Sequence, residues 1–546
     1  MTGLENTTLY NEDMKGITTD NSSFELFRKY DALYVDKTEF ICRLLSVWPK
    51  RFFFISRPRR FGKSLFCDTL RNVFEGHKEL FRGLYIYDKY DFEPYPVLSF
   101  NFAGQSISSI ERFTERIAWN IKRYGKIYGV DMIGDDPAFL LEQLLIGIAE
   151  NTGKKAVIII DEYDSPITTA IIEKKPFVDE IRSILNSFYS TIKNSSQYIH
   201  FFFMTGVVKL SNLSIFSAMN NLVDLSMKEE FAGAFGYTDE ELDEYFREGI
   251  DEYLEANPGK YKSREEFREK IRSYYDGYRF SPESETRVYN PVSIGFFFND
   301  GCKFDNYWIQ TGATSFAVAL ARNVDLSKIL SSQELKTTAA AFTTFDISDI
   351  REKNLTERKM IAMLYYTGYF SIESYDEPYI HLSFPNAEVA ASFVNHLLEQ
   401  YSSDRNMEFD GWAKEFYDAC KDGNEENLVR KLTEYFDAFS YELIGDEKEK
   451  FYRAIFHAIF FLTGVYSITE DRGLRGRADE VIITSDSLWI FELKVDGCAA
   501  DALRQIEDKG YADKYADMIE RRKLKVHKVG ISFSSKTRKI ESWKSE

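Results

Sequence analysis

Short apolar segments alternate with amphipathic segments between about residues 50 and 210. Four runs, each bounded by charged or turn residues, are predicted to be strands: 51–56, 96–102, 155–161 and 198–206. The run KAVIIID at 155–161 is continuously apolar, as a strand buried on both faces should be. Helical patterns such as SIERFTERIAWNIKRYGKIYG lie between the strands. This alternation predicts an α/β fold in which helices cover a parallel sheet.

The pattern changes twice further along the chain. From about 236 to 405 acidic amphipathic helices and aromatic turns dominate, as in TDEELDEYFREGIDEYLEAN. From about 446 a long helical pattern, EKEKFYRAIFHAIFFLTG, precedes the strand-like runs ADEVIIT and LWIFELKV, a further helix and the run HKVGISF. This last region predicts a small α/β module. We therefore expect three domains, a number that the length of 546 residues also favours: 1–235, 236–405 and 406–546.

Composition excludes several classes of protein. Hydrophobic residues make up 44% of the chain, which is ample for packed cores and argues against a disordered protein. The five cysteines form no C-x-x-C pair, so they fit reduced thiols and argue against a cysteine-based zinc site. No run reaches the ~18 apolar residues of a membrane span, and the polar, acidic start MTGLENTTLYNEDMKG is typical of neither a signal nor a transit peptide. We expect a cytoplasmic protein without membrane contact.

The formal net charge of −18 argues against a surface that binds nucleic acid throughout. The balance reverses at the C-terminal end, where residues 501–546 contain 12 Lys and Arg against 8 Asp and Glu. Either a local basic track or a solvated helical face explains this reversal.

The stretch FFFISRPRRFGKSLFCDTL, residues 52–70, has the context of a phosphate-binding loop. An apolar strand leads into a turn, and Gly62, Lys63 and Ser64 open a helix whose positive end favours an anion. Lys63 would reach the β- and γ-phosphates of a nucleotide, and the Ser64 hydroxyl would hold Mg²⁺. Arg57 stands where the pattern G-x-x-x-x-G-K-[ST] has its first glycine. A nucleotide site and a basic surface loop therefore both remain open from this stretch alone.

A second motif, AVIIIDEYDS at 156–165, favours the nucleotide site. Four apolar residues precede Asp161 and Glu162, as in a Walker B strand. Asp161 would bind the metal through water, and Glu162 would polarise the attacking water. The alternative is that both carboxylates only cap a strand end. Thr205 lies at the end of the next predicted strand. Its hydroxyl either contacts the γ-phosphate as a sensor, or Thr205 is an ordinary strand-end threonine without such a role.

The ordered motifs resemble the AAA-ATPase-like family of prokaryotic proteins. The resemblance begins with YVDKTEFI, SRPRRFGKSL, IIIDEYDSPI and MTGVVKLS, and it continues with FGYTDEEL, YYDGYRF, VYNPVSIGFFF, YWIQTG, LYYTGYF and LSFPNAEV, so it covers essentially the whole chain. In that family the first Walker A glycine is commonly replaced, and RPRRFGKS is a usual form. The resemblance implies a P-loop NTPase sheet, ATP and Mg²⁺ as cofactors, and a helical lid, which can be a winged helix, in the middle region.

The resemblance also assigns nucleotide contacts residue by residue. Besides Thr205, these contacts follow the loop in order: Arg57, Pro58, Arg59, Arg60, Phe61, Gly62, Lys63, Ser64 and Leu65. Arg279, in YYDGYRF, is either a sensor or finger arginine of the lid or part of a structural turn fixed by Gly277 and packed tyrosines.

A second constellation lies in GRADEVIITSDSLWIFELKV, residues 476–495. Glu492 and Lys494 are two residues apart in one predicted strand, so they point to the same side, and Asp479 on the neighbouring strand can meet them. Two carboxylates and a lysine around Mg²⁺ are what phosphodiester hydrolysis needs. This D-x(n)-E-x-K pattern resembles the PD-(D/E)XK nuclease superfamily, which implies a restriction-endonuclease-like domain with Mg²⁺, or Mn²⁺, on Asp479 and Glu492. A solvent-facing ion pair is the alternative.

Further residues are weaker candidates around the same cleft. Gln505 lies on the following helix, where related nucleases often carry a supporting glutamine, and Glu449 on the preceding helix is an outer acidic ligand or a surface residue. The other candidates are placed near this cleft by sequence position alone: Lys509, Tyr511, Arg475 and Arg477. His457 lies in an apolar helical pattern and is interpreted as a core residue.

The sequence thus predicts an ATP-binding and ATP-hydrolysing protein coupled to a metal-dependent nuclease. The alternative is an ATP-switched regulatory or scaffold protein whose nuclease-like domain binds nucleic acid or a partner without cutting. The expected partners are ATP and nucleic acid, with DNA favoured over RNA. Assembly into a homo-oligomer stays open.

Overall fold

The computed structural model describes most of the chain, in these ranges: 16–19, 22–46, 51–104, 107–210, 222–310, 336–338, 357–390, 392–393, 409–437, 466–473, 476–484, 486–537 and 539–546. The chain divides into two compact units. The first comprises residues 1–320 and 336–388, and the second comprises 321–335 and 389–546. The predicted domain limits at 235 and 405 stay predictions.

A five-stranded parallel sheet forms the centre of the first unit. The strands run in the spatial order β2-β3-β4-β1-β5, with these bounds: β1 Phe52–Ser56, β2 Val97–Asn101, β3 Ala156–Asp161, β4 Ile199–Gly206 and β5 Leu222–Asp224. Every residue of β1 and β3 is buried, because side chains on both faces of a parallel sheet pack under helices. The predicted α/β fold and its four strands are confirmed.

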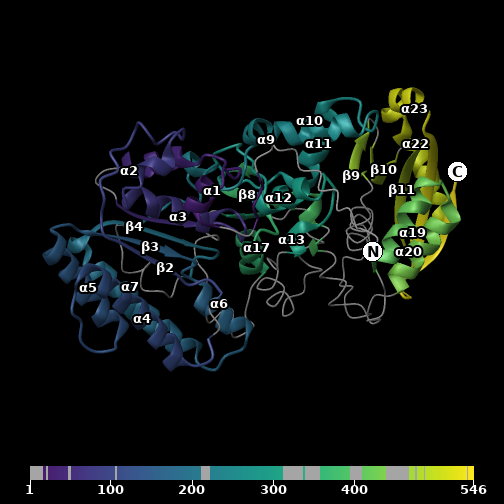
Figure 1. Cartoon of the computed structure of the whole chain (residues 1–546). Helices are drawn as coiled ribbons and strands as arrows, with labels where there is room; N and C mark the ends of the chain where they lie inside the picture. The colour runs from purple at the N-terminus through teal and green to yellow at the C-terminus, as the bar shows by residue number, and fades with distance from the viewer. Residues whose placement is uncertain are drawn as a thin grey trace, which may run out of the picture. The chain divides into compact units, whose positions relative to one another are not determined.

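Helices cover both faces of this sheet (Figure 1). On one side lie α1 (Phe24–Lys29), α2 (Thr38–Ser46) and α3 (Lys63–Phe74). On the other side lie α4 (Ile110–Tyr128), α5 (Pro137–Thr152) and α7 (Val178–Asn194). Short elements connect them: η1 Lys78–Phe81, α6 Ser165–Ile172, η2 Ser196–Tyr198 and η3 Glu229–Phe231.

The remainder of the first unit is mainly helical. Its helices are α9 Asp239–Tyr245, α10 Arg247–Ala256, α11 Arg264–Tyr275, α12 Pro291–Asn299, α13 Tyr307–Gln310 and α17 Glu357–Tyr366. Buried aromatic side chains, among them Phe246, Phe267 and Phe297, form a core that helices α9 to α13 share. A small antiparallel sheet has the order β6-β8-β7 and these bounds: β6 Lys336–Thr338, β7 Ser371–Asp376 and β8 Tyr379–Ser383. The winged-helix form stays a prediction.

The second unit contains a five-stranded mixed sheet in the order β13-β12-β11-β10-β9. Its bounds are β9 Tyr466–Gly473, β10 Gly476–Ile483, β11 Ser487–Val495, β12 Lys525–Phe533 and β13 Ile540–Ser545. β11 and β12 are parallel, and helix α22 (Ala499–Lys509) connects them; the other neighbours are antiparallel. Further helical elements are α19 Phe409–Lys421, α20 Glu425–Asp437, η6 Tyr511–Tyr515 and α23 Ala516–Arg522. The predicted small α/β module is confirmed.

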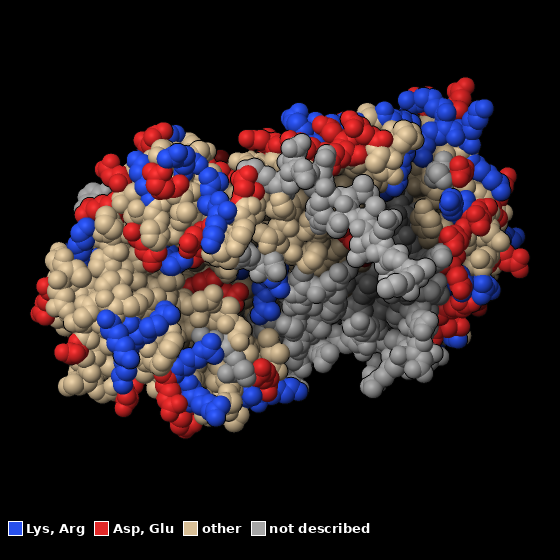
Figure 2. Space-filling view, viewed as in Figure 1, with Lys and Arg blue, Asp and Glu red and all other residues tan. Residues whose placement is uncertain are grey.

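Charged side chains of both signs are interspersed on the face of the first unit seen in Figure 2, and several Lys and Arg side chains gather where Figure 1 labels α4. Among the described helices, none combines the length and the apolar character needed to cross a bilayer.

Candidate functional sites

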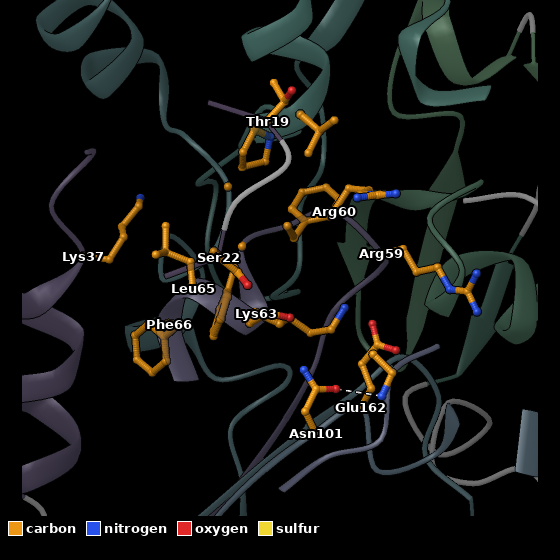
Figure 3. A pocket seen from close by; sticks show the side chains of 18 of the residues that line it. Thr19, Ser22, Lys37, Arg59, Arg60, Lys63, Leu65, Phe66, Asn101 and Glu162 are labelled. Atoms are coloured by element: carbon orange, nitrogen blue, oxygen red, sulfur yellow. Dashed lines mark hydrogen bonds between the residues drawn. The ribbon is translucent and has the colours of Figure 1, made fainter. Parts of the chain in front are cut away.

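A cavity of about 710 Å³ lies in the first unit, at the carboxyl ends of the sheet strands. The loop 59–65 and Glu162 line it, together with the N-terminal residues Thr18, Thr19 and Ser22 and the segments 234–237 and 291–292. In Figure 3 the side chains of Lys63, Arg59 and Glu162 lie on one side of the cavity, and Thr19 lies far from them. The cavity has room for a nucleotide, whose phosphates would lie at the loop.

The loop opens helix α3 as the sequence predicts. Gly62 has a φ of 83°, which favours glycine, although an added Cβ would meet nothing within 4 Å. The Lys63 ammonium donates to the backbone carbonyls of Arg57 at 3.0 Å and Pro58 at 2.8 Å. Burial lowers the pKa of Lys63, and the carboxylates of Glu162 and Asp161 oppose this shift. Lys63 is therefore a buried amine at the edge of the cavity, held by two backbone carbonyls of its own loop.

Asp161 is the centre of a hydrogen-bond cluster beneath the loop. Its carboxylate accepts from the Ser64 hydroxyl at 2.5 Å and from the Thr205 hydroxyl at 2.6 Å, and the Asn101 amide lies at 3.4 Å. The strand order explains this meeting, because β4 lies between β1 and β3 and β2 pairs with β3. The hydroxyl oxygen of Ser64 and the carboxylate oxygen of Asp161 that it contacts are ligands of the kind that Mg²⁺ prefers. The two residues therefore fit this ion.

Glu162 follows Asp161 in a left-handed backbone conformation, with a φ of 52°. This conformation is uncommon for a side chain other than glycine and costs about 1–3 kcal/mol. The Glu162 backbone N–H points to the Thr205 hydroxyl at 3.4 Å, and the side chain lines the cavity. Such strain at a strand end turns the carboxylate toward the cavity, near Lys63 (Figure 3).

Arg57 points into the protein, away from the loop that it opens. Its guanidinium donates to the carbonyls of Ser226 at 2.7 Å and Phe231 at 3.0 Å, and it lies 4.3 Å from the ring centroid of Phe280. Burial lowers the pKa of Arg57 to about 10, which still leaves it charged at neutral pH. Phe61 packs edge-on against the same Phe280 ring. Arg57 and Phe61 therefore anchor the loop, while Arg59 and Arg60 line the cavity.

Two residues of this site were not among the sequence candidates. Asn101 ends β2 beside Asp161, and a polar residue at the carboxyl end of a parallel strand is the signal that could have indicated it. Asp164 is fully buried and accepts from the backbone N–H groups of Val207 at 3.1 Å and Val208 at 2.9 Å. Burial raises the pKa of Asp164 to about 6. Asp164 thereby fixes the segment that leaves β4.

In the second unit, the antiparallel pairing of β10 and β11 brings Asp479 and Glu492 together. Glu480 is opposite Phe491, so Asp479 and Glu492 are neighbours across the two strands. The Leu493 backbone N–H donates to the Asp479 carboxylate at 2.8 Å. Both carboxylates are buried, with 6% and 1% of their surfaces exposed.

Lys494 and Gln505 complete this cluster. The Lys494 ammonium lies 3.4 Å from a Glu492 oxygen and donates to the Gln505 carbonyl oxygen at 2.7 Å. The Gln505 amide donates to the same Glu492 carboxylate, and it lies 3.4 Å from the Tyr511 hydroxyl. The structure therefore brings together Asp479, Glu492, Lys494 and Gln505.

Gly530, which sequence reasoning missed, lets helix α22 approach this cluster. It pairs with Glu492 on the neighbouring strand, and a Cβ on it would lie 2.4 Å from the Ala499 carbonyl oxygen and 2.6 Å from the Leu503 nitrogen. No larger residue fits without moving α22, which carries Gln505. A glycine inside an apolar strand pattern is the signal that could have indicated this close approach.

The donor set fits a divalent cation that takes part of its shell from water or substrate. Two adjacent carboxylates suit Mg²⁺ or Mn²⁺, since both ions prefer oxygen ligands. Among the described residues no group of three or more His, Cys, Asp or Glu side chains could hold a metal ion. Asp479 and Glu492 therefore would supply only part of the coordination.

The remaining candidates lie in different places. Arg279 is 3% exposed and donates to the carbonyls of Ser281 at 3.1 Å and Pro282 at 2.8 Å, so it fixes its own turn. Lys509 is exposed in the last turn of α22. Glu449, His457, Arg475 and the side chain of Arg477 lie outside the described residues.

Comparison with known proteins identifies both regions. The family described as predicted AAA-ATPase matches residues 18–216, and the PD-(D/E)XK nuclease superfamily matches residues 447–543. An uncharacterized protein encoded in the vnfD 5′ region of Azotobacter chroococcum mcd 1 is 30% identical over 522 residues, which cover 93% of this chain and 94% of that protein. The chain therefore belongs to the predicted AAA-ATPase family and carries a C-terminal domain of the PD-(D/E)XK nuclease superfamily.

Proposed function

We propose that the first unit binds and hydrolyses ATP and that the second unit hydrolyses phosphodiester bonds of nucleic acid, with DNA favoured over RNA. The observation that carries the proposal is the cluster at Asp161, which Ser64 and Thr205 hold at the base of a loop that carries the buried side chain of Lys63. The cross-strand pair Asp479 and Glu492 supports the second activity.

In the first site each side chain would have a separate role. Lys63 would contact the β- and γ-phosphates, releasing the two loop carbonyls that it now contacts. Glu162 would accept a proton from the attacking water, and Arg59 would face the charge of the transferred phosphoryl group. Thr205 orients Asp161, and contact of its hydroxyl with the γ-phosphate stays a prediction. Ser64 and Asp161 would hold Mg²⁺, which when bound would neutralise further phosphate charge.

Two substitutions test the ATPase. Lys63→Ala should lower ATP affinity and turnover, because it removes the cation at the phosphates. Glu162→Gln should bind ATP normally and lower kcat by about 10²- to 10⁴-fold, the usual contribution of a general base. Isothermal titration with ATP and a phosphate-release assay measure the two effects. Lys89→Ala, an exposed lysine outside the cavity, is the control. Turnover by Glu162→Gln at the wild-type rate would contradict the assignment.

In the second site, Asp479 and Glu492 would hold the cation, which when bound polarises the phosphate and activates a water. Lys494 would steady the charge that develops on the phosphate. Gln505 acts through its neighbours: it fixes the Glu492 carboxylate and the Lys494 ammonium relative to each other. It is a positioning residue.

Nuclease assays on plasmid DNA, single-stranded DNA and RNA with Mg²⁺ or Mn²⁺ test this activity. Asp479→Asn and Lys494→Ala should abolish cleavage, and Gln505→Ala should lower it by about 10- to 100-fold and raise the metal concentration required. Asp508→Asn, an exposed carboxylate on the same helix as Gln505, should cleave normally. If the wild type and these variants are equally inactive on every substrate, the alternative of a binding domain that does not cut replaces the proposal.

A further inference from the structure

Helix α4 presents an exposed stripe of cations around one tryptophan. The stripe consists of Arg112, Arg116, Trp119, Arg123 and Lys126, and we call it the α4 stripe. The spacing of four, three, four and three residues places all five side chains on one face of the helix. All five are exposed, and Trp119 keeps 62% of its surface accessible. In Figure 2 Lys and Arg side chains gather over this part of the first unit.

None of the four cations forms an ion pair with a carboxylate in the part of the chain that the structure describes. Elsewhere in the unit, the exposed Arg43 pairs with Glu39 of its own helix, and the half-buried Arg71 pairs with Asp68. On α4, Glu111 and Glu115 lie at the margin of the stripe without pairing with it. The Arg123 guanidinium lies 5.8 Å from the Trp119 ring centroid instead. The stripe is therefore a locally positive surface in a chain of net charge −18.

The opposite face of α4 explains why the stripe does not serve the fold. Phe113, Ile117 and Ile121 are buried on that face, and the Tyr124 hydroxyl donates to the Ser99 carbonyl on β2 at 2.9 Å. Ser109 and Gly129 cap the two ends of the helix. The helix is thus fixed by its inner face and its caps. The stripe can be replaced without exposing a core.

We propose that the α4 stripe binds single-stranded nucleic acid. The cations would contact successive phosphates along a helix face about 21 Å long, at a rise of ~1.5 Å per residue. An unpaired base would stack on the Trp119 indole, which a duplex could not do because its bases already stack on each other. An acidic protein surface could pair with the four cations, but that pairing would not use the exposed indole between two arginines. The proposal requires neither ATP hydrolysis nor cleavage by the second unit.

Anisotropy titrations of fluorescein-labelled dT20 with the full chain, in EDTA so that no cleavage occurs, test the proposal. Trp119→Ala should raise Kd by about 5- to 150-fold, the range expected for one lost stacking contact. Arg116→Gln with Arg123→Gln should lower the slope of log K against log salt by about 1.4, at ~0.7 per cation for single strands. Single-stranded RNA and a DNA duplex of equal length complete the set, and the duplex should bind without sensitivity to Trp119→Ala.

The second unit can also bind the oligonucleotide, so a positional readout is needed. Photocrosslinking of 5-iodouracil-substituted dT20, followed by mass spectrometry, should give an adduct on the peptide that contains Trp119. The matched controls are Tyr30→Ala, which removes another exposed aromatic ring with a lysine beside it, and Arg82→Gln with Lys89→Gln, which removes two exposed cations elsewhere in the unit.

Three results would overturn the proposal. Unchanged dT20 affinity and unchanged salt slope in the stripe variants, with crosslinks only elsewhere, would exclude the contact. Equal competition by polyglutamate at the same charge, with no effect of Trp119→Ala, would indicate a general anion or protein surface. A change of oligomeric state in the stripe variants, without a change in dT20 affinity, would indicate a contact between copies of the chain.

Discussion

The contacts of Arg57 explain how the loop is held although the first glycine of the motif is missing. A glycine at the first position of a phosphate loop permits unusual backbone angles, but Arg57 is not among the described residues with a positive φ. Its guanidinium instead donates to two carbonyls beyond the sheet and stacks on Phe280. The loop is thus held by a buried side chain, and its cavity side is left to Arg59, Arg60 and Lys63.

Restoring the motif at this position should therefore harm the protein. Arg57→Gly removes the guanidinium, so the Ser226 and Phe231 carbonyls stay buried and lose this hydrogen-bond donor. We therefore expect the free energy of unfolding of the first unit to fall by about 3 kcal/mol or more. ATP affinity should not rise. Urea denaturation and nucleotide titration measure these quantities. Tighter ATP binding by Arg57→Gly at unchanged stability would show that the position is a degraded phosphate contact.

At the scale of elements, one buried carboxyl connects several parts of the first unit. Glu388 follows the hairpin of β7 and β8, and it accepts from the Ser293 hydroxyl of α12 at 3.1 Å and from the Trp308 backbone N–H of α13 at 2.6 Å. Burial raises the pKa of Glu388 to about 8. The carboxyl is therefore mainly protonated in the folded chain at neutral pH.

This shift predicts a pH dependence of stability. The folded pKa of Glu388 lies above the ordinary value of 4.5, so its contribution to stability is complete below pH 4.5 and is lost as the pH rises toward 8. The wild type should lose up to about 1.4 kcal/mol per pH unit relative to Glu388→Gln across this window. Denaturation at intervals from pH 5 to 8.5 measures the difference, with Glu283→Gln, an exposed carboxyl, as the control. Parallel profiles of the wild type and Glu388→Gln would contradict the assignment.

At the scale of the whole molecule, the chain holds two separate compact units with one candidate site in each. The cavity at Lys63 belongs to the first unit, and the cluster at Glu492 belongs to the second. Coupling between the two proposed activities would be a property of the full chain. It would be visible as a change in cleavage rate when Lys63→Ala removes nucleotide binding.

Because a ligand stabilises only the unit that binds it, ATP should act on one unfolding transition. In calorimetry of Glu162→Gln, which should bind without turnover, saturating ATP and Mg²⁺ should raise the midpoint of one transition by on the order of 5 °C. Adding Lys63→Ala should abolish this shift. An equal shift of both transitions would mean that the nucleotide contacts both units or that they unfold together.

The sequence by itself predicted four strands of the first sheet and the candidate residues of both sites. Continuous apolar runs fix buried parallel strands, and a spacing of two residues puts Glu492 and Lys494 on one side of a strand, since both patterns depend only on local backbone geometry. Asp161 was a candidate because it ends such a strand. Lys63 and Ser64 were candidates because the run Gly-Lys-Ser opens a helix after a strand and a turn, a sequence that is also local.

Tertiary structure alone decided which of these residues meet and which serve the fold. The order of strands brings Thr205 and Asn101 to Asp161, and Gly530 lets α22 carry Gln505 to Glu492. The direction of Arg57, into the protein rather than toward the cavity, depends on carbonyls about 170 residues further along the chain. No local pattern encodes such contacts, because they depend on where distant backbone groups come to lie once the core has packed.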